Sequence, residues 1–351
     1  MNSTPHSNGF PDSGTPPDDP GTQRPDATEQ AWRRRARLTV LWSAVVGIAL
    51  LAAAVVVAWS WHGELPDPVA SHWGPGGSPD AFSSLAALLT TASVLGIGCV
   101  ALFAAIGLFS GRAAATLRIT AASTVWICGM LAVLPVGSLA GQRGLTDAHQ
   151  TSGLDWIVLT ALLAPIIPAA LAALLVPADR PQPATGPLPA SAPRVRLAGT
   201  TRAVWLRQTS GGPGPLVAIA GTLVIVVLSI VSRMPALLAL AALLALLFAT
   251  MFAFRVRVDA AGIEVRSALG WPRTRIGAEE IERAEVIEVS PFRDFGGWGW
   301  RINHSGRQGI VLRSGPGLLV EQSGGRSLVV TVDDADQAAA LLNTMASRAR
   351  F

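Results

Sequence analysis

Six long apolar runs occupy most of the first 254 residues of this 351-residue chain. A helix needs about 20 residues to cross the ~30 Å hydrocarbon core of a bilayer. Each run reaches or approaches that length, so the pattern predicts an α-helical integral membrane bundle of six transmembrane helices. The runs cover residues 38–61, 85–109, 119–140, 156–176, 215–232 and 234–254.

Only a short break separates the last two apolar runs. If residues 215–254 formed one helix, it would be about 60 Å long at 1.5 Å per residue, twice the thickness of the hydrocarbon core. Arg233 would then lie near its middle, where a charge costs at least ~2.5 kcal/mol. Met234 and Pro235 follow Arg233 directly. We therefore predict a transmembrane hairpin over 215–254 with Arg233 in its turn.

The pattern changes near residue 255 to an alternation of apolar and polar residues, which is typical of β-strands. Residues 255–267 predict a β-hairpin around Asp259 and Gly262. Asp333 or Asp334 can cap a last helix over 335–347. We expect short antiparallel strands that form a small mainly-β barrel or sandwich with a C-terminal helix. Further strands are predicted at 271–276, 283–289, 298–302, 308–313, 316–321 and 326–332.

Two polar segments divide the chain. Residues 1–31 are rich in Pro, Ser, Gly and Asp, so they predict a disordered N-terminal tail. Residues 178–214 begin with a Pro-rich stretch and predict a cytoplasmic linker. We therefore expect a tail (1–31), a four-helix transmembrane domain (32–177) with an external loop (62–84), a linker (178–214), a transmembrane hairpin (215–254) and a cytoplasmic β domain (255–351).

The distribution of arginine predicts the orientation. All 27 basic residues are Arg, and the chain is 50% hydrophobic and only 14% charged. With a cytoplasmic N-terminus, the inner flanks and loops up to residue 257 hold 13 Arg, whereas the outer loops hold only Arg143 and Arg233. Loops rich in arginine stay in the cytoplasm, so we expect both termini there, in a bacterial cytoplasmic (inner) membrane. Because the arginines flank apolar runs, the net charge of +4 indicates the lipid bilayer as partner and no nucleic acid.

The loop after the first apolar run carries the most distinctive motif, LPDPVASHWGPGGSPD over residues 65–80. It resembles the uncharacterised LPxxxPxHW/F-loop family of actinobacterial-type multi-span membrane proteins, which includes SdpI-type immunity proteins. Ala70 lies where this family often has a second proline. The resemblance implies a multi-spanning protein and, as in some relatives, immunity or signal transfer. The matching residues are Leu65, Pro66, His72, Trp73, Gly74, Gly77 and Asp80, and Asp67 completes the candidate loop site.

Three roles are open for this loop. Its prolines and glycines favour a structured turn that caps the helix pair. It could instead recognise an envelope ligand or peptide, with His72 as a pH-responsive contact. The third role is a metal site formed by His62, Glu64, Asp67, His72 and Asp80. These residues lack the helical i, i+4 pair or the Cys-x-x-Cys spacing typical of metal sites, so we predict no metal.

The C-terminal part resembles bacterial pleckstrin-homology-like (PH-like) domains in its segments 278–286 and 324–334 and in the two-span hairpin that precedes it. The resemblance implies a binding or assembly module. The aromatic stretch 291–300 either packs on the domain or the bilayer, or forms a surface for a cytoplasmic protein. Trp298, Trp300 and Arg301 would lead such a surface. The early strands hold arginines that are either ordinary flanks or contacts with anionic lipid: Arg255, Arg257, Arg266, Arg273 and Arg275.

The sequence lacks the common catalytic motifs. No GxSxG, HExxH or Walker A pattern occurs. The apolar runs hold no carboxylate, histidine or lysine away from their ends, which disfavours ion-coupled transport. We therefore expect no cofactor and no enzyme. The predicted function is that of a non-enzymatic sensor, scaffold or immunity-type protein that couples the external loop to the cytoplasmic domain. The alternative is a transporter or permease for an uncharged solute.

Overall fold

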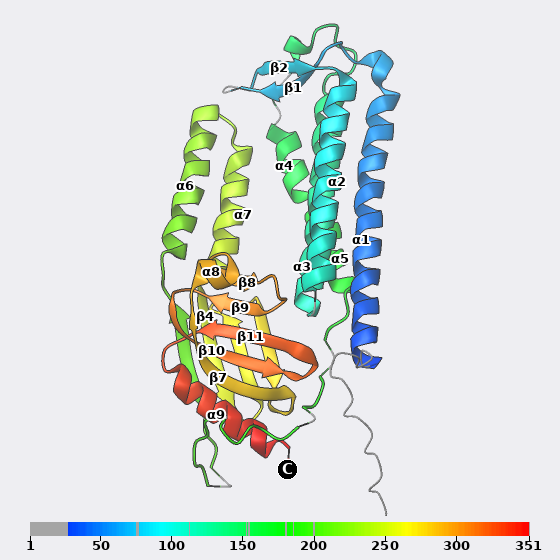
Figure 1. Cartoon of the computed structure of the whole chain (residues 1–351). Coiled ribbons are helices and arrows are strands. Elements are labelled where there is room, and N and C mark those ends of the chain that lie inside the picture. Colours follow the sequence, from blue (N-terminus) through cyan, green and yellow to red (C-terminus); the bar gives the residue numbers. More distant parts are fainter. Residues whose placement is uncertain are drawn as a thin grey trace, which may run out of the picture.

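A computed structural model of the chain describes residues 27–350, apart from 75–76, 112, 152, 154, 180, 185 and 199–200. A group of long helices and a β domain lie end to end (Figure 1). Residues 1–26 of the predicted tail lie outside the described residues. The predicted tail extends to residue 31, whereas helix α1 (Ala27–Ser60) already begins at Ala27.

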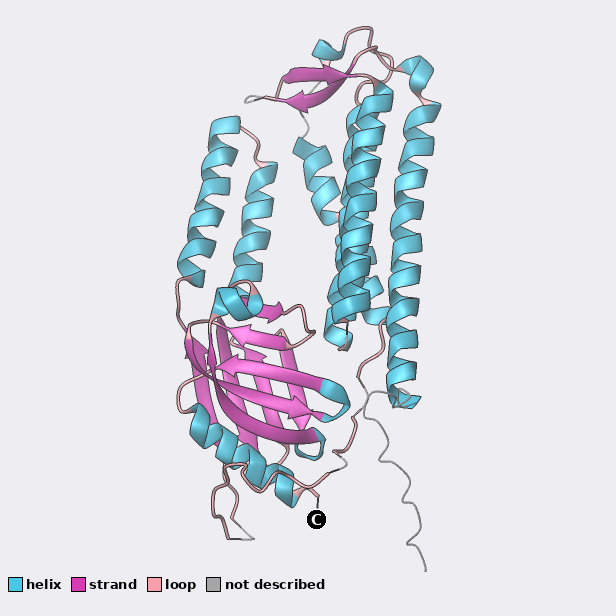
Figure 2. Ribbon diagram, in the orientation of Figure 1, coloured by secondary structure: helices cyan, strands magenta, loops and turns pink. Residues whose placement is uncertain are grey.

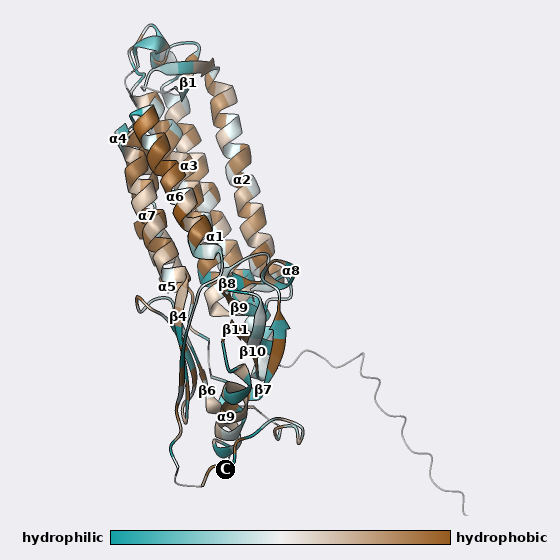
Figure 3. Cartoon of the chain, turned by 90° about the vertical axis from the view of Figure 1, so that its left-hand side faces the viewer, coloured by the Kyte–Doolittle hydropathy of each residue, from teal (hydrophilic) through white to brown (hydrophobic). Residues whose placement is uncertain are grey.

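Within the described residues, five helical segments are long and apolar enough to cross a membrane. Apolar residues cover the outward surfaces of these helices (Figure 3). A sixth apolar helix, α7 (Ala236–Met251), has 16 residues and is about 24 Å long at 1.5 Å per residue. Five of the six predicted spans are therefore long enough to cross a membrane, and the predicted count of six is not confirmed. The five segments are α1, α2 (Leu85–Ser110), α3 (Ala114–Ala140), α4 (Asp155–Leu163) together with α5 (Ile166–Leu175), and α6 (Gly214–Ser232).

The fourth segment is interrupted at Pro165, which lies between α4 and α5. Proline has no N–H and clashes with the preceding turn, so an α-helix breaks there. The indole Nε1 of Trp126 on α3 donates to the carbonyl of Leu162 at 3.1 Å, next to the break. A Cβ on Gly129 would lie 2.8 Å from Pro165, so a small residue on α3 makes room for the bend. α3 therefore supports the irregular backbone.

The β domain contains two sheets that face each other (Figure 2). The four-stranded sheet has the order β3-β4-β5-β6, and the five-stranded sheet has the order β7-β10-β11-β9-β8. One apolar core, which includes Phe254, Val265, Leu318, Val330 and Leu342, joins both sheets to the C-terminal helix α9 (Ala335–Arg348). The strands are β3 (Trp205–Ser210), β4 (Ala253–Asp259), β5 (Gly262–Ser267), β6 (Arg273–Gly277), β7 (Ile281–Val289), β8 (Gly299–Ile302), β9 (Gln308–Val311), β10 (Gly315–Gln322) and β11 (Arg326–Thr331).

Of the predicted barrel or sandwich, the barrel is not formed, because the nine strands of the domain divide into two separate open sheets. Two other details of the predicted β domain are wrong. The strands are not all antiparallel, since β9 and β11 pair in parallel. Asp334 lies at the N-cap position of α9, but its side chain makes no capping bond. It accepts instead from Arg207 on β3 at 2.7 Å.

The linker and hairpin boundaries also change. The C-terminal part of the predicted linker 178–214 forms β3, which pairs with β4 over six residue pairs from Trp205↔Val258 to Ser210↔Ala253. The predicted hairpin 215–254 overlaps β4, which begins at Ala253. The helical hairpin α6–α7 is therefore inserted between two neighbouring strands of one sheet. Arg233 lies in the hairpin turn as predicted, in the left-handed region at φ 53°.

Candidate functional site

The predicted external loop forms a small cap on the end of the helices that lies away from the β domain (Figure 1). The cap comprises residues 61–84 and 141–151, apart from 75–76. Its two strands, β1 (Val69–Trp73) and β2 (Pro79–Ser83), pair antiparallel. Two short 3₁₀ helices, His62–Glu64 and Ala148–Gln150, flank them. The predicted structured turn over the helix ends is therefore present as a β-hairpin.

Gln142, just after α3, anchors the first cap strand. Its side chain is fully buried. Its Oε1 accepts from the N–H of Ala70 at 2.7 Å, and its Nε2 donates to the carbonyls of Ala70 at 3.1 Å and Ser138 at 3.2 Å. A buried backbone amide needs such partners. The side chain of Gln142 therefore makes the hydrogen bonds to Ala70 that a neighbouring strand would otherwise make. No local signal in the sequence connects two residues that lie 72 positions apart.

The apolar half of the cap packs on the helix ends. Val69 is buried with Ala58 of α1, Leu89 of α2 and Leu139 of α3. Leu65 packs against the same cluster, and the neighbouring motif residue Pro66 is buried. Asp67 is exposed and Trp73 half-buried. Leu65 and Pro66 therefore act in packing.

His72 and Asp80 of the motif form a pair across the β1–β2 hairpin, with Nδ1 and Oδ1 2.5 Å apart. Both side chains are largely exposed, at 69% and 48%. A Cβ at position 74 would lie 2.6 Å from the Asp80 carboxylate, so Gly74 leaves room for the observed position of that side chain. Gly77 has φ +78°, the left-handed region that favours glycine. The two glycines thus shape the hairpin, and His72 and Asp80 form its exposed polar face.

The second segment of the cap, residues 141–151, supplies partners that the motif alone does not reveal. Arg143 contacts Glu64 with Nη2 and Oε2 2.7 Å apart, and its guanidinium lies 4.8 Å from the ring centroid of Trp61. His149 contacts Asp147 at 2.8 Å, and its ring lies tilted by 39° against that of Phe82 of β2, with ring centroids 4.3 Å apart.

Hydrogen bonds from the backbone and side chain of His149 hold the pKa of Asp147 below its usual value. Its charged form is therefore favoured in the folded cap.

The candidate metal ligands do not gather. His72 pairs with Asp80, whereas Glu64 faces Arg143 and His62 lies beside Trp59. Among the described residues, no group of three or more His, Cys, Asp or Glu side chains is placed to hold an ion. The exposed His–carboxylate pairs instead offer hydrogen-bonding groups to a ligand on this face.

The predicted partner-binding residues lie in the β domain after α8 (Pro291–Phe295), at the end that faces the helices (Figure 1). Trp300 is half-buried and packs on the core beside Phe254, with ring centroids 6.1 Å apart. Trp298 is half-buried and meets the exposed ring of Phe292 edge-on at 4.6 Å. Arg301 is exposed and donates to the carbonyl of Trp298 at 2.8 Å. Phe292, which sequence reasoning did not select, is the most exposed aromatic of this group.

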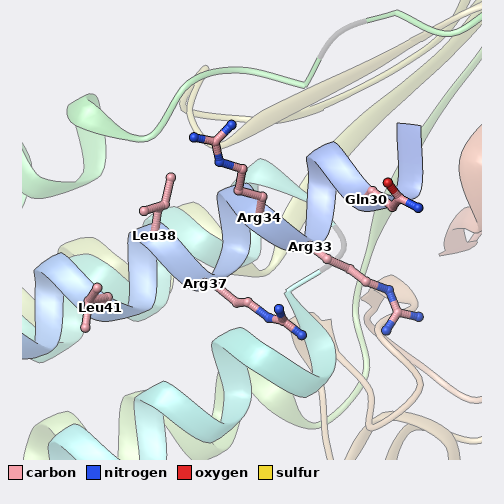
Figure 4. A pocket seen from close by; sticks show the side chains of 6 residues that line it. All are labelled: Gln30, Arg33, Arg34, Arg37, Leu38 and Leu41. Atoms are coloured by element: carbon pink, nitrogen blue, oxygen red, sulfur yellow. The ribbon is translucent and has the colours of Figure 1, made fainter. Parts of the chain in front are cut away.

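The predicted lipid-contacting arginines share one face of the four-stranded sheet. All five are exposed and alternate with buried or half-buried residues along the strands: Arg255 and Arg257 on β4, Arg266 on β5, and Arg273 and Arg275 on β6. A second basic feature lies at the start of α1, where a hollow of about 290 Å³ is lined by arginines and apolar side chains. Arg33 and Arg37 point to one side of the helix and Arg34 to the other (Figure 4). Leu38 and Leu41 form the apolar part of that hollow.

Asp179 joins the helices to the β domain. Its carboxylate accepts from the N–H of Ala114 at the start of α3, at 2.9 Å and 3.0 Å. It also lies 3.8 Å from Arg35 of α1 and 3.9 Å from Arg326 of β11. Arg326 in turn contacts Glu280 at 3.1 Å. One carboxylate at a helix N-terminus therefore touches both parts of the molecule.

Residues 48–96 match the family model described as "Domain of unknown function (DUF1648)", a family found in multi-span membrane proteins. The matched range runs from the middle of α1 through both cap strands into α2, and it contains the whole loop motif. No curated protein and no solved structure matches the chain. The match and the apolar helices together indicate a multi-span membrane protein.

Proposed function

We propose that this protein is a non-enzymatic membrane sensor or scaffold, in which the cap meets an envelope ligand or peptide and the β domain binds a cytoplasmic partner. An immunity-type role is the case in which that ligand is a toxic peptide. The 13 to 2 distribution of arginines supports a cytoplasmic β domain and cytoplasmic termini in a bacterial inner membrane. A binding module of the PH-like kind fits a domain of two sheets and one covering helix.

One observation carries the proposal: α6 and α7 are inserted between β3 and β4. These strands pair over six residue pairs, so the two ends of the hairpin enter one sheet as neighbours. A shift of one hairpin helix relative to the other would strain this ladder. α7 also packs against α4 of the bundle. A change in helix packing therefore has a direct physical route into the domain core.

This route requires α6 and α7 to cross the membrane together, which makes six spans in all. α6 supports this assignment because it exposes many large apolar side chains, among them Leu216, Ile219, Ile230 and Val231. α7 is short, but a span of 16 residues is accommodated by local thinning of the bilayer at modest cost. Arg233 then lies at the far surface, where its charge can reach water.

Hydrogen exchange of the full-length protein in lipid nanodiscs tests the coupling. Gln142→Ala removes the cap anchor, and Ser71→Ala on the same strand serves as the matched control. We expect Gln142→Ala to speed exchange in β3 and β4 as well as in the cap, while α9 is unchanged. A change confined to the cap would overturn the coupling.

A photo-reactive residue at Phe292 then tests the partner in cells, with one at the cap residue Ser71 as control. We expect a discrete cytoplasmic protein to be captured at Phe292 alone, and its yield should change in the Gln142→Ala variant. Capture of lipid alone would contradict the partner role.

A permease for an uncharged solute is the second candidate, and the interruption of the fourth segment at Pro165 favours it. Broken helices line the substrate sites of many transporters. Solute flux into proteoliposomes tests this candidate. Flux that is lost in a Trp126→Phe variant, which removes the hydrogen bond at the break, would replace the sensor proposal.

A further inference from the structure

Three arginines form a continuous row across the four-stranded sheet. In the strand register, Arg255 of β4 lies opposite Arg266 of β5, and Arg266 lies opposite Arg273 of β6. Like charges directly opposite each other destabilise a sheet. Gln208 of β3 completes the row, so it contains no acidic residue. Among the ion pairs of the described residues, none includes any of these three arginines.

The next row on the same face differs in its charges. Arg257 and Arg275 lie on either side of Glu264 in the register. Arg257 also contacts Asp259, with Nε and Oδ2 2.9 Å apart. Two acids thus accompany two arginines in this part of the face. The row of Arg255, Arg266 and Arg273 is the place where positive charge is left without compensation.

The loop between β5 and β6 adds an apolar tip beside that row. Leu269 and Trp271 are 60% and 68% exposed. The loop is nevertheless held in place, since the N–H of Ser267 donates to the carbonyl of Pro272 at 2.9 Å, and the N–H of Gly270 to that of Ser267 at 2.8 Å. Arg266 donates to the carbonyl of Gly270 at 3.2 Å. An ordered loop that presents Trp and Leu to the outside is typical of a binding surface.

The tip and the row lie at the end of the domain from which the hairpin emerges. α7 ends at Met251, β4 begins at Ala253, and the N–H of Ala268 donates to the carbonyl of Ala253 at 2.8 Å. The tip is thus level with the end of α7. At about 3.3 Å per residue, Arg255 lies roughly 7 Å and Arg257 roughly 13 Å beyond Ala253. The headgroup layer is roughly 5–8 Å thick, so the backbone of the first row lies within this layer and that of the second row lies beyond it.

We propose that this surface binds anionic phospholipid headgroups of the adjacent leaflet, with Leu269 and Trp271 in the interface and Arg255, Arg266 and Arg273 on the phosphates. Trp prefers the membrane–water interface, and long arginine side chains extend toward it. The inference rests on α6–α7 crossing the bilayer and not on the coupling between cap and domain. It assigns lipid contact to three of the five arginines and excludes Arg257 and Arg275.

Hydrogen exchange of the full-length protein tests the surface in two kinds of nanodisc, one of phosphatidylcholine and one mixed with phosphatidylglycerol. We expect residues 266–274 to exchange roughly tenfold more slowly in the anionic discs, and high salt to remove the difference. The Arg255→Gln/Arg273→Gln double variant should abolish the difference. Arg257→Gln/Arg275→Gln removes the same charges from the same two strands and should leave it intact.

The proposal is overturned if wild-type exchange is equal in the two discs, or if the two double variants behave alike. Exchange in α9 reports whether a variant is folded, and the salt dependence of the wild type requires no variant. Protection of α6 and α7 in the same data reports their insertion. Failure of the surface with an inserted hairpin is therefore distinguishable from failure of the six-span arrangement.

Discussion

Gln142 in the cap and Asn343 in the β domain fix a strand in the same way. Asn343 on α9 is fully buried, accepts from the N–H of Ala284 at 2.9 Å and donates to its carbonyl at 2.8 Å. Gln142 makes the same pair of bonds with Ala70. In both cases a side-chain carboxamide satisfies a strand that has no neighbour on that side, since β7 is an edge strand and β1 belongs to a two-stranded sheet.

The two regions differ in the apolar core against which the strand packs. β7 covers a core shared by two sheets and α9. β1 contributes Val69 and Ala70 to the buried layer, while the rest of the hairpin carries exposed polar residues. A two-stranded hairpin has little stability of its own. The comparison indicates that the β domain unfolds as a unit, whereas the cap can open by itself, as a ligand-binding element requires.

Asn343→Ala should have the largest effect. It leaves the buried N–H and carbonyl of Ala284 unpaired, and also the carbonyl of Pro193, to which Asn343 donates at 3.0 Å. We expect the β domain to lose about 3 kcal/mol of unfolding free energy. Exchange of β10 and β11 amides in the full-length protein measures this loss, with Gln337→Ala on the exposed side of α9 as control. A loss confined to β7 would contradict the view of one cooperative unit.

Gln142→Ala should cost less, about 2 kcal/mol, because the freed groups of Ala70 reach water when the cap opens. The expected result is about 30-fold faster exchange of β1 and β2 amides, a smaller acceleration in β3 and β4 through the hairpin, and no change in β10. Ser71→Ala, which removes only a hydrogen bond to Ala81 at 3.2 Å, should leave exchange nearly unchanged. Collapse of the whole helix bundle in Gln142→Ala would show that the cap is not an independent unit.

Arg143→Gln should have a smaller effect, below about 1 kcal/mol, because the ion pair with Glu64 is 42% and 52% exposed. Part of the loss comes from the contact with the ring of Trp61. Thermal unfolding of the purified protein at low and high salt measures it. Glu64→Gln is the matched variant, and a larger effect for Glu64→Gln would show that the ring contact contributes little.

A fall in pH should have the smallest effect on stability, and it should act on both the cap and the β domain. The pKa of Asp147 is lowered by hydrogen bonds from His149, and that of Asp294 by hydrogen bonds from Arg293 and the N–H of Ser290. A folded pKa below the ordinary value of 3.8 adds stability at neutral pH. That stability is lost as the pH falls below this value toward the folded pKa. Asp147→Asn should remove the acid sensitivity of the cap alone, as measured by local exchange corrected for intrinsic rates.

The sequence predicted where most residues of the candidate site lie along the chain, but it did not predict which of them contact one another. The motif located the cap, and the alternation of residues located the basic face of the sheet. Gln142, Arg143 and His149 were missed because they act across long sequence separations. Leu269 was missed because a loop between predicted strands gives no signal of exposure. Trp271 was missed because it was assigned to the predicted strand 271–276, whereas β6 begins at Arg273.

The sequence by itself determined the elements whose cause is local. The long apolar runs predicted the helices, Arg233 predicted the hairpin turn, and period-two alternation predicted most of the strands, because each depends on hydrophobicity or backbone geometry within a few residues. Only the tertiary structure decided that β3 leaves the linker to join β4, that β9 runs parallel to β11, and that Arg255, Arg266 and Arg273 share a row. Strand pairing depends on contacts between distant segments, and single-strand patterns fix neither the neighbour nor the register.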